Sequence, residues 1–145
     1  MQSIRRPAPH DKRQMPPLLV TAAIVRHERK ILITRRPEGS RQAGYWEFPG
    51  GKLEEGESPE QCLEREILEE LGVVSMIGPI FDVVYYCYPW GDILLLAYDC
   101  QLRERTIRNL GVAEHRWVLP KHLDRYELLP ADAPLVKKLQ NLPSS

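Results

Sequence analysis

The sequence predicts one α/β or α+β domain in which a mixed β-sheet is sandwiched between α-helices. Apolar, β-branched-rich runs lie before and after one strongly capped helix, and a second helical segment lies near the end of the chain. The length of 145 residues, with 43% hydrophobic side chains, suits one core rather than two. Equal numbers of basic and acidic side chains, 20 of each, exclude the uniformly basic surface that favours nonspecific DNA binding.

Residues 1–17 are expected to form a flexible, basic, proline-rich arm, which leaves 18–145 as the single folded domain. The arm contains four of the 13 prolines and four basic side chains against one acid, Asp11. Such a segment cannot bury enough apolar surface to fold, and without interleaved aromatic residues it does not predict a nucleic-acid partner. No apolar stretch follows the basic residues, so we expect no secretory signal, no membrane span and a cytoplasmic location.

The chain before the helix predicts a hairpin, a loop and a short strand. Residues 18–25 and 30–34 are apolar runs separated by a polar tetrapeptide, which is typical of a hairpin. Residues 35–44 are polar and contain a proline and two glycines, so they indicate a loop. Residues 45–48 predict a short strand that ends at Pro49-Gly50-Gly51, where the backbone can approach another group closely.

The clearest helix signal begins at Ser58. Ser58 is suited to the N-cap, Pro59 to the first helical position and Gln61 to the capping box, and Leu71-Gly72 supplies a stop. At about 100° per residue, four side chains form one apolar stripe for the core. They are Leu63, Ile67, Leu68 and Leu71.

The second half of the chain predicts another hairpin, a strand and a helix. Residues 80–88 and 93–102 flank a Pro-Trp-Gly-Asp turn, and 115–119 indicate a further short strand. Asp132 can cap a last helix that ends at about Gln140. Three cysteines without a CxxC pair indicate buried, reduced thiols rather than a disulfide framework or a zinc site. They are Cys62, Cys87 and Cys100.

One edge of the first predicted helix concentrates negative charge. Glu66, Glu69 and Glu70 share an arc of about 100° beside the apolar stripe. Like charges three and four positions apart cost a helix about 0.2–0.5 kcal/mol per pair. A solvated acidic face is one interpretation. The other is a divalent cation held by these carboxylates and a carbonyl from Gly50-Gly51, and ligation by oxygen alone favours Mg²⁺ or Mn²⁺ over zinc.

The spacing of these residues matches a known motif. Residues 51–73 read GKLEEGESPEQCLEREILEELGV. This stretch resembles the Nudix box, G-x5-E-x7-R-E-U-x-E-E-x-G-U with U aliphatic, at every defined position. The similarity extends to the MutT-like nucleoside triphosphate pyrophosphohydrolases through 33–36, 47–52, Trp117 and 129–132. It implies a Nudix fold and cleavage of a nucleoside diphosphate linked to another group.

The resemblance also implies a role for each matching residue. The expected metal ligands are the Gly50 carbonyl, Glu66, Glu69, Glu70 and Glu114. Glu114 precedes the strand of Trp117, although the ungapped family position falls at Gly111, and a plain surface acid is the alternative. Arg65 would orient acidic side chains, and Glu66, or else Glu70, would take the proton of the attacking water. Glu57 would be a further ligand or an ion-pair partner of Arg65.

Four residues match positions that belong to the substrate site of MutT-like enzymes: Arg36, Phe48, Lys52 and Asp132. A surface cation, a core residue and a helix cap are the alternatives for Arg36, Phe48 and Asp132. Members specific for 8-oxoguanine have Asn at the position of Asp132, and Asp is familiar from relatives that act on cytidine nucleotides. An ionised Asp only accepts hydrogen bonds, whereas Asn both donates and accepts, so the base stays open.

The predicted function is Mg²⁺-dependent hydrolysis of a nucleoside triphosphate to monophosphate and pyrophosphate. The substrate could be an oxidised or modified deoxynucleotide such as 8-oxo-dGTP, which implies sanitation of the nucleotide pool, or a cytidine nucleotide. Within the family, ADP-ribose, sugar nucleotides, dinucleoside polyphosphates and RNA 5′ ends are alternatives. A non-catalytic binding module is a further alternative, which the intact glutamates and Arg65 disfavour. The oligomeric state stays open.

Overall fold

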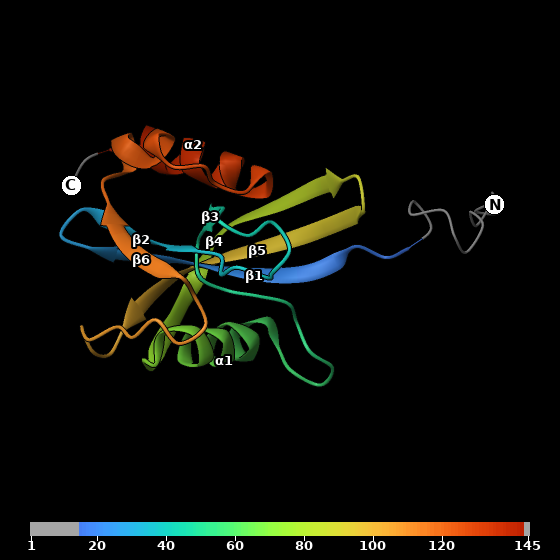
Figure 1. Ribbon diagram of the computed structural model, residues 1–145, viewed down its shortest axis with the longest axis horizontal. Helices are drawn as coiled ribbons and strands as arrows, with labels where there is room; N and C mark the ends of the chain where they lie inside the picture. The colour runs from blue at the N-terminus through green and yellow to red at the C-terminus, as the bar shows by residue number, and fades with distance from the viewer. Residues whose placement is uncertain (1–14, 144–145) are drawn as a thin grey trace.

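The computed structural model describes residues 15–143 and confirms a mixed α+β fold (Figure 1). The strands are β1 (Leu18–His27), β2 (Lys30–Arg35), β3 (Trp46–Glu47), β4 (Ser75–Tyr88), β5 (Gly91–Leu102) and β6 (Glu114–Val118). The helices are α1 (Pro59–Leu71) and α2 (Ala133–Asn141), and the short 3₁₀ helices are η2 (Pro120–Arg125) and η3 (Pro130–Asp132). The expected N-terminal arm lies almost wholly outside the described residues, which begin at Met15.

The strands form one mixed sheet in the order β3-β2-β1-β5-β4. β6 also belongs to this sheet and pairs with β2. β1 and β5 run parallel, from Leu18 opposite Ile93 to Val25 opposite Cys100. The other strand pairs are antiparallel, and they include both predicted hairpins, β1–β2 and β4–β5. The parallel pair places the starts of β1 and β5 side by side.

β4 begins at Ser75, earlier than the predicted residue 80. The Gly78-Pro79 pair made this segment resemble a break. Instead, the ladder with β5 shifts register between Ile77 and Ile80 and again before Asp82. An edge strand tolerates proline and bulges because one of its sides needs no ladder hydrogen bonds.

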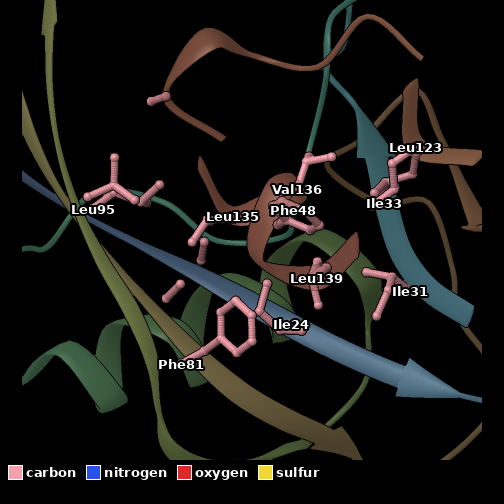
Figure 2. Close-up of a cluster of buried hydrophobic side chains, with 14 of the residues drawn as sticks. Ile24, Ile31, Ile33, Phe48, Phe81, Leu95, Leu123, Leu135, Val136 and Leu139 are labelled. Carbon is pink, nitrogen blue, oxygen red and sulfur yellow. The ribbon is translucent and has the colours of Figure 1, made fainter. Parts of the chain in front are cut away.

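The sheet has a hydrophobic core on each face, because successive side chains of a strand point to opposite faces. Ala22 and Ile24 of β1 pack in the core under α2, whereas Ala23 and Val25 pack in the core over α1. Figure 1 shows α2 on one side of the sheet and α1 on the other. Figure 2 shows the core beside α2, where Phe48 and Leu95 meet side chains of the helix. The predicted sandwich of a sheet between helices is confirmed.

α1 has the predicted ends. The Ser58 hydroxyl accepts from the Gln61 backbone N–H at 3.1 Å, the Gln61 side chain accepts from the Ser58 N–H at 2.8 Å, and Gly72 closes the helix in the left-handed region. The predicted stripe is wrong at Leu68, which is 51% exposed. Cys62, at the opposite edge of the stripe from Leu68, is buried instead. The helix is therefore rotated about its axis so that the Cys62 edge, rather than the Leu68 edge, faces the sheet.

α2 confirms the predicted second helix but not its cap. Asp132 has helical backbone angles (φ −84°, ψ −11°), and its side chain makes no capping hydrogen bond. The reason is that η3 runs directly into α2, so the helical backbone begins before the predicted cap position. The Asp132 carboxyl group is therefore available for another role.

The cysteine prediction holds for two residues. Cys62 and Cys100 are buried, whereas Cys87 is exposed near the tip of the β4–β5 hairpin, and the three form no disulfide. Within residues 15–143, no helix has both the length and the apolar composition needed to cross a membrane.

Candidate active site

The glycine turn after β3 brings the backbone against α1. The Thr21 N–H donates to the Gly51 carbonyl at 2.8 Å and the Ala23 N–H to the Pro49 carbonyl at 2.7 Å, so β1 fixes the turn. A Cβ atom at Gly51 would lie 2.1 Å from the Glu66 Oε2 atom, and one at Gly50 would lie 2.0 Å from the Thr21 carbonyl oxygen. At Gly50 the backbone of β1 and the positive φ require glycine, whereas at Gly51 a side chain would displace the Glu66 carboxylate, so the turn lies directly against a carboxylate of α1.

Three acidic side chains with raised pKa values, Glu47, Glu66 and Glu70, gather beside this turn, and we call them the acid cluster. Burial and the negative charges of Glu47 and Glu66 raise the pKa of Glu70 to about 9, although a hydrogen bond with the Gly50 backbone opposes the shift. Burial also raises the pKa of Glu66, with a contribution from Glu69, and the pKa of Glu47. Without a cation, burial and mutual repulsion therefore disfavour full ionisation of the cluster.

Sequence reasoning did not identify Glu47 as a site residue. It follows the buried Trp46 in β3 and forms an ion pair with Arg36 at 3.0 Å. Its charge raises the pKa values of both Glu70 and Asp132. The sequence signal that could have identified Glu47 is an acid in the short strand directly before the glycine turn. Through its charge, Glu47 affects both Glu70 of α1 and Asp132.

Arg65 orients three glutamates. Its guanidinium donates to Glu57 at 2.7 and 3.0 Å, to Glu66 at 2.7 Å and to Glu69 at 3.1 Å, and it also bonds the Lys52 carbonyl at 3.2 Å. The two bonds lower the pKa of Glu57 to about 2. The contacts agree with the ion-pair interpretation of Glu57 and with an orienting role for Arg65.

The donor atoms beside the turn suit a hard cation. Among residues 15–143, no three His, Cys, Asp or Glu side chains already surround a common point as metal ligands would. In particular, Glu69 pairs with Arg65 and its side chain is 60% exposed. The α1 glutamates and the carbonyl of Gly50 nevertheless offer oxygen donors, which Mg²⁺ and Mn²⁺ prefer. A cation would also offset the charge that raises the pKa values of Glu66 and Glu70.

The raised pKa of Glu70 predicts that the metal-free protein loses stability as the pH rises. Between the ordinary pKa of 4.5 and the folded value of about 9, the unfolded chain has released a proton that the folded chain retains. The unfolded state then binds fewer protons, so the free energy of unfolding falls with pH. We expect the Tm of metal-free protein to fall from about pH 5 to about pH 8, and Glu70→Gln to flatten this decline. Mg²⁺ should raise the Tm by binding the folded state.

Thermal melts in EDTA, measured for the wild type and Glu70→Gln over the same pH range, check this expectation. Equal pH slopes for the two proteins, or no effect of Mg²⁺ on the wild type, would contradict it.

Glu114 lies at the start of β6, where cations hold it. Its carboxylate pairs with Arg35 at 2.8 Å and with Arg116 at 3.2 Å, and these partners lower its pKa. The Gly111 N–H instead bonds the Glu70 carbonyl at 3.1 Å, so the chain nearest α1 at this point carries no acid. The metal role of Glu114 stays a prediction, and its contacts agree better with the surface-acid alternative.

From these ion pairs we expect Glu114→Gln to leave the apparent Mg²⁺ affinity and kcat unchanged. Activity titrated with Mg²⁺ checks this, with Glu69→Gln as the matched variant that loses affinity. A loss of affinity in Glu114→Gln as large as in Glu69→Gln would restore Glu114 as a ligand.

The four predicted substrate residues all line one cavity of about 210 Å³. They are Arg36, Phe48, Lys52 and Asp132, and the same cavity reaches Gly50 and Gly51. Phe48 belongs to the core as well, so both interpretations of this residue hold. A second cavity, of about 330 Å³ beside Arg26 and Leu119, is lined by none of these residues.

Asp132 is only 5% exposed, and its Oδ2 atom has no hydrogen-bond partner among residues 15–143. Burial and the charge of Glu47 hold its pKa well above the ordinary value, although a hydrogen bond with the Phe48 backbone opposes this. Burial therefore favours the protonated form of Asp132 over the ionised, purely accepting carboxylate expected from the sequence. A protonated Asp132 can donate one hydrogen bond and accept others, as Asn does.

Comparison with known proteins identifies the family. The family model described as NUDIX domain matches residues 15–139. The chain belongs to the Nudix family. Members of this family generally need a divalent metal. The matched residues include the α1 glutamates, whose spacing resembles the Nudix box.

Two bacterial relatives match most of this Nudix protein. The CTP pyrophosphohydrolase of Escherichia coli is 37% identical over 126 residues, which cover 85% of this chain and 91% of the relative. The 8-oxo-dGTP diphosphatase of Haemophilus influenzae is 37% identical over 125 residues, which cover 84% and 90%. These relatives are named for different bases.

Solved structures confirm the Nudix fold. The solution structure of the E. coli ORF135 protein matches with a TM-score of 0.74 and 35% identity, covering 87% of this chain and 90% of that one. The crystal structure of the MutT protein from Methanosarcina mazei Go1 matches with a TM-score of 0.77 and 26% identity, covering 86% and 94%.

Proposed function

We propose that this Nudix protein hydrolyses a nucleoside triphosphate to the monophosphate and pyrophosphate. One observation carries the proposal: the glycine turn joins the acid cluster to the cavity, so that Gly50 and Gly51 line the cavity while Glu66 lies against Gly51. The names of the two bacterial relatives, a CTP pyrophosphohydrolase and an 8-oxo-dGTP diphosphatase, support this reaction class.

The residues that would hold Mg²⁺ or Mn²⁺ are the Gly50 carbonyl, Glu66, Glu69 and Glu70. When bound, the cation would neutralise phosphate oxygens and lower the pKa of a bound water. Glu66 is the residue we assign as general base, because Arg65 fixes its carboxylate at 2.7 Å beside the glycine turn. Glu70 is the second candidate: its raised pKa keeps it protonated in the metal-free protein, and a bound cation would favour the carboxylate, which can take up a proton.

The cavity side of the site would bind the nucleotide. Arg36 and Lys52 place positive charge at the lining, where it can offset the phosphate groups. Phe48 supplies an apolar wall, and Asp132 would read the edge of the base with its unpartnered oxygen. A protonated Asp132 can donate and accept hydrogen bonds, so it can pair with the edge of an oxidised purine or of a cytosine. We therefore propose both kinds of nucleotide as candidate substrates. We place this activity in the cytoplasm, acting on the nucleotide pool.

The test is a panel of ordinary, oxidised and methylated nucleoside triphosphates, with ADP-ribose and a dinucleoside polyphosphate as further substrates. Pyrophosphate release and kcat/KM are measured with Mg²⁺ or Mn²⁺. We expect monophosphate and pyrophosphate from a subset of the triphosphates. Turnover of ADP-ribose or the dinucleoside polyphosphate alone would overturn the substrate class, and nucleotide binding without any turnover would indicate a binding module.

A further inference from the structure

Two residues that the proposed chemistry does not use stand together at the cavity. Arg41 belongs to the segment between β2 and β3, and Trp90 belongs to the turn between β4 and β5. Both line the cavity that Asp132 and Phe48 also line. The Arg41 guanidinium carbon lies 4.4 Å from the centre of the Trp90 ring. The pair therefore bridges two loops that are far apart in the sequence.

Trp90 extends a row of aromatic rings. Its ring is stacked on Tyr88 with centres 5.1 Å apart and planes 10° from parallel, and Tyr88 in turn packs against Tyr86 at 4.6 Å. The Tyr88 hydroxyl accepts from the Ala131 N–H at 3.1 Å, directly before Asp132 in the chain. The row thus connects the exposed Trp90 with the segment that carries the buried acid.

One face of the Trp90 ring is covered by Tyr88, so the Arg41 guanidinium lies over the other face. A guanidinium is a planar group that stacks on aromatic rings. The second face of Trp90 therefore already accommodates a flat ligand. Nucleobases are also flat, and they stack on aromatic side chains whatever their hydrogen-bonding pattern. Trp90 is 43% exposed and lines the cavity, so displacement of the Arg41 side chain would open this face to a base.

We propose that the face of Trp90 covered by Arg41 is the stacking surface for the nucleobase, and that Arg41 leaves the indole when the base binds. The inference rests on the proposed function, since it needs a nucleotide as substrate. Arg36 Nε donates to the Arg41 carbonyl at 2.6 Å, so the backbone of the loop stays anchored when the Arg41 side chain moves. Stacking on Trp90 adds affinity for every base, whereas the edge of the base is left to Asp132.

The test compares a nucleoside triphosphate with ribose 5-triphosphate, which has no base. In Trp90→Leu, kcat/KM for the nucleotide should fall about ten-fold through KM, which is within the range for one stacked base, while kcat/KM for the base-free compound stays the same. Trp90→Phe should recover most of the loss, because a smaller ring still stacks. Arg41→Met should not raise KM for the nucleotide, because the guanidinium competes with the base.

Tyr85→Leu is the matched control, because Tyr85 is an exposed aromatic residue of the same hairpin and does not line the cavity. A non-hydrolysable nucleotide should also quench tryptophan fluorescence in the wild type more than in Trp90→Phe, which tests the proposal even if Trp90→Leu does not fold. The proposal is overturned if Trp90→Leu lowers kcat/KM equally for the nucleotide and for ribose 5-triphosphate, or if its kcat/KM values match those of Tyr85→Leu. It is also overturned if the nucleotide quenches fluorescence equally in the wild type and in Trp90→Phe. A rise in KM for Arg41→Met would overturn the displacement of Arg41. Failure of the wild type to hydrolyse any nucleoside triphosphate would instead refute the proposed function.

Discussion

Glu66→Gln is expected to lower kcat by about 10²–10⁴-fold, the range that general acid or base catalysis contributes. The substitution keeps the size of the side chain and removes its charge beside the glycine turn. In the structure the Glu66 carboxylate lies against Gly51 and accepts a hydrogen bond from Arg65. No other described acid has both contacts, so we expect none to replace Glu66. The helix should stay folded, because the like-charge pairs of Glu66 with Glu69 and with Glu70 are removed at the same time.

The measurement is steady-state hydrolysis titrated with Mg²⁺ up to saturation, together with a melting curve for each variant. Glu64→Gln is the matched control, since Glu64 is exposed on the same helix and outside the arc of the three glutamates. A kcat loss in Glu66→Gln with unchanged Mg²⁺ affinity would support its role as base, whereas a loss of affinity would identify it chiefly as a ligand. Activity equal to that of Glu64→Gln would contradict both roles.

Asp132→Leu is expected to reduce the discrimination between bases by about 1–3 kcal/mol, since a buried polar group mismatched with its ligand keeps its desolvation cost. Asp132→Asn should behave differently. Because burial raises the pKa of Asp132, we expect the protonated side chain, which donates and accepts as Asn does, to contribute at the lower end of the pH range, where wild type and Asp132→Asn should have similar base preferences. Asp132→Asn should also keep its Tm, because the side chain is not a helix cap.

The two should diverge as the pH rises, because Asp132 loses its proton and its donor while Asn does not. Ratios of kcat/KM for 8-oxo-dGTP over dCTP, measured across pH, isolate this effect because catalytic groups that serve both substrates cancel. We expect the ratio to fall with pH in the wild type and to stay flat in Asp132→Asn. A flat wild-type ratio, or unchanged discrimination in Asp132→Leu, would remove Asp132 from base recognition.

Local signals made α1 predictable. Ser58, Gln61 and Gly72 act within one turn of their own position, so their geometry follows from sequence spacing alone. The same holds for the glutamates at fixed spacing along the helix. Leu68 was assigned to the core, but it is exposed. The sequence shows which side chains form the apolar face of a helix, but it does not show how the helix is rotated about its axis when it packs on the sheet.

Properties that depend on tertiary burial were not predictable in the same way. The pKa of Asp132 is raised by burial and by Glu47, and the distance in sequence between these two residues hides their proximity. Glu114 could be named as a candidate because it precedes the strand of Trp117, but its pairing with Arg35 depends on the register of β6 on β2. The start of β4 was missed because Gly78-Pro79 indicates a break unless the strand is known to lie at an edge.

The central claim is that the glutamates of α1 act through a divalent cation on a nucleotide held in the adjacent cavity. The most direct test is pyrophosphate release from a nucleoside triphosphate by protein stripped with EDTA, with metal removal verified by elemental analysis. We expect no turnover in excess EDTA and recovery when Mg²⁺ or Mn²⁺ is added back. Wild-type turnover by verified metal-free protein would contradict it.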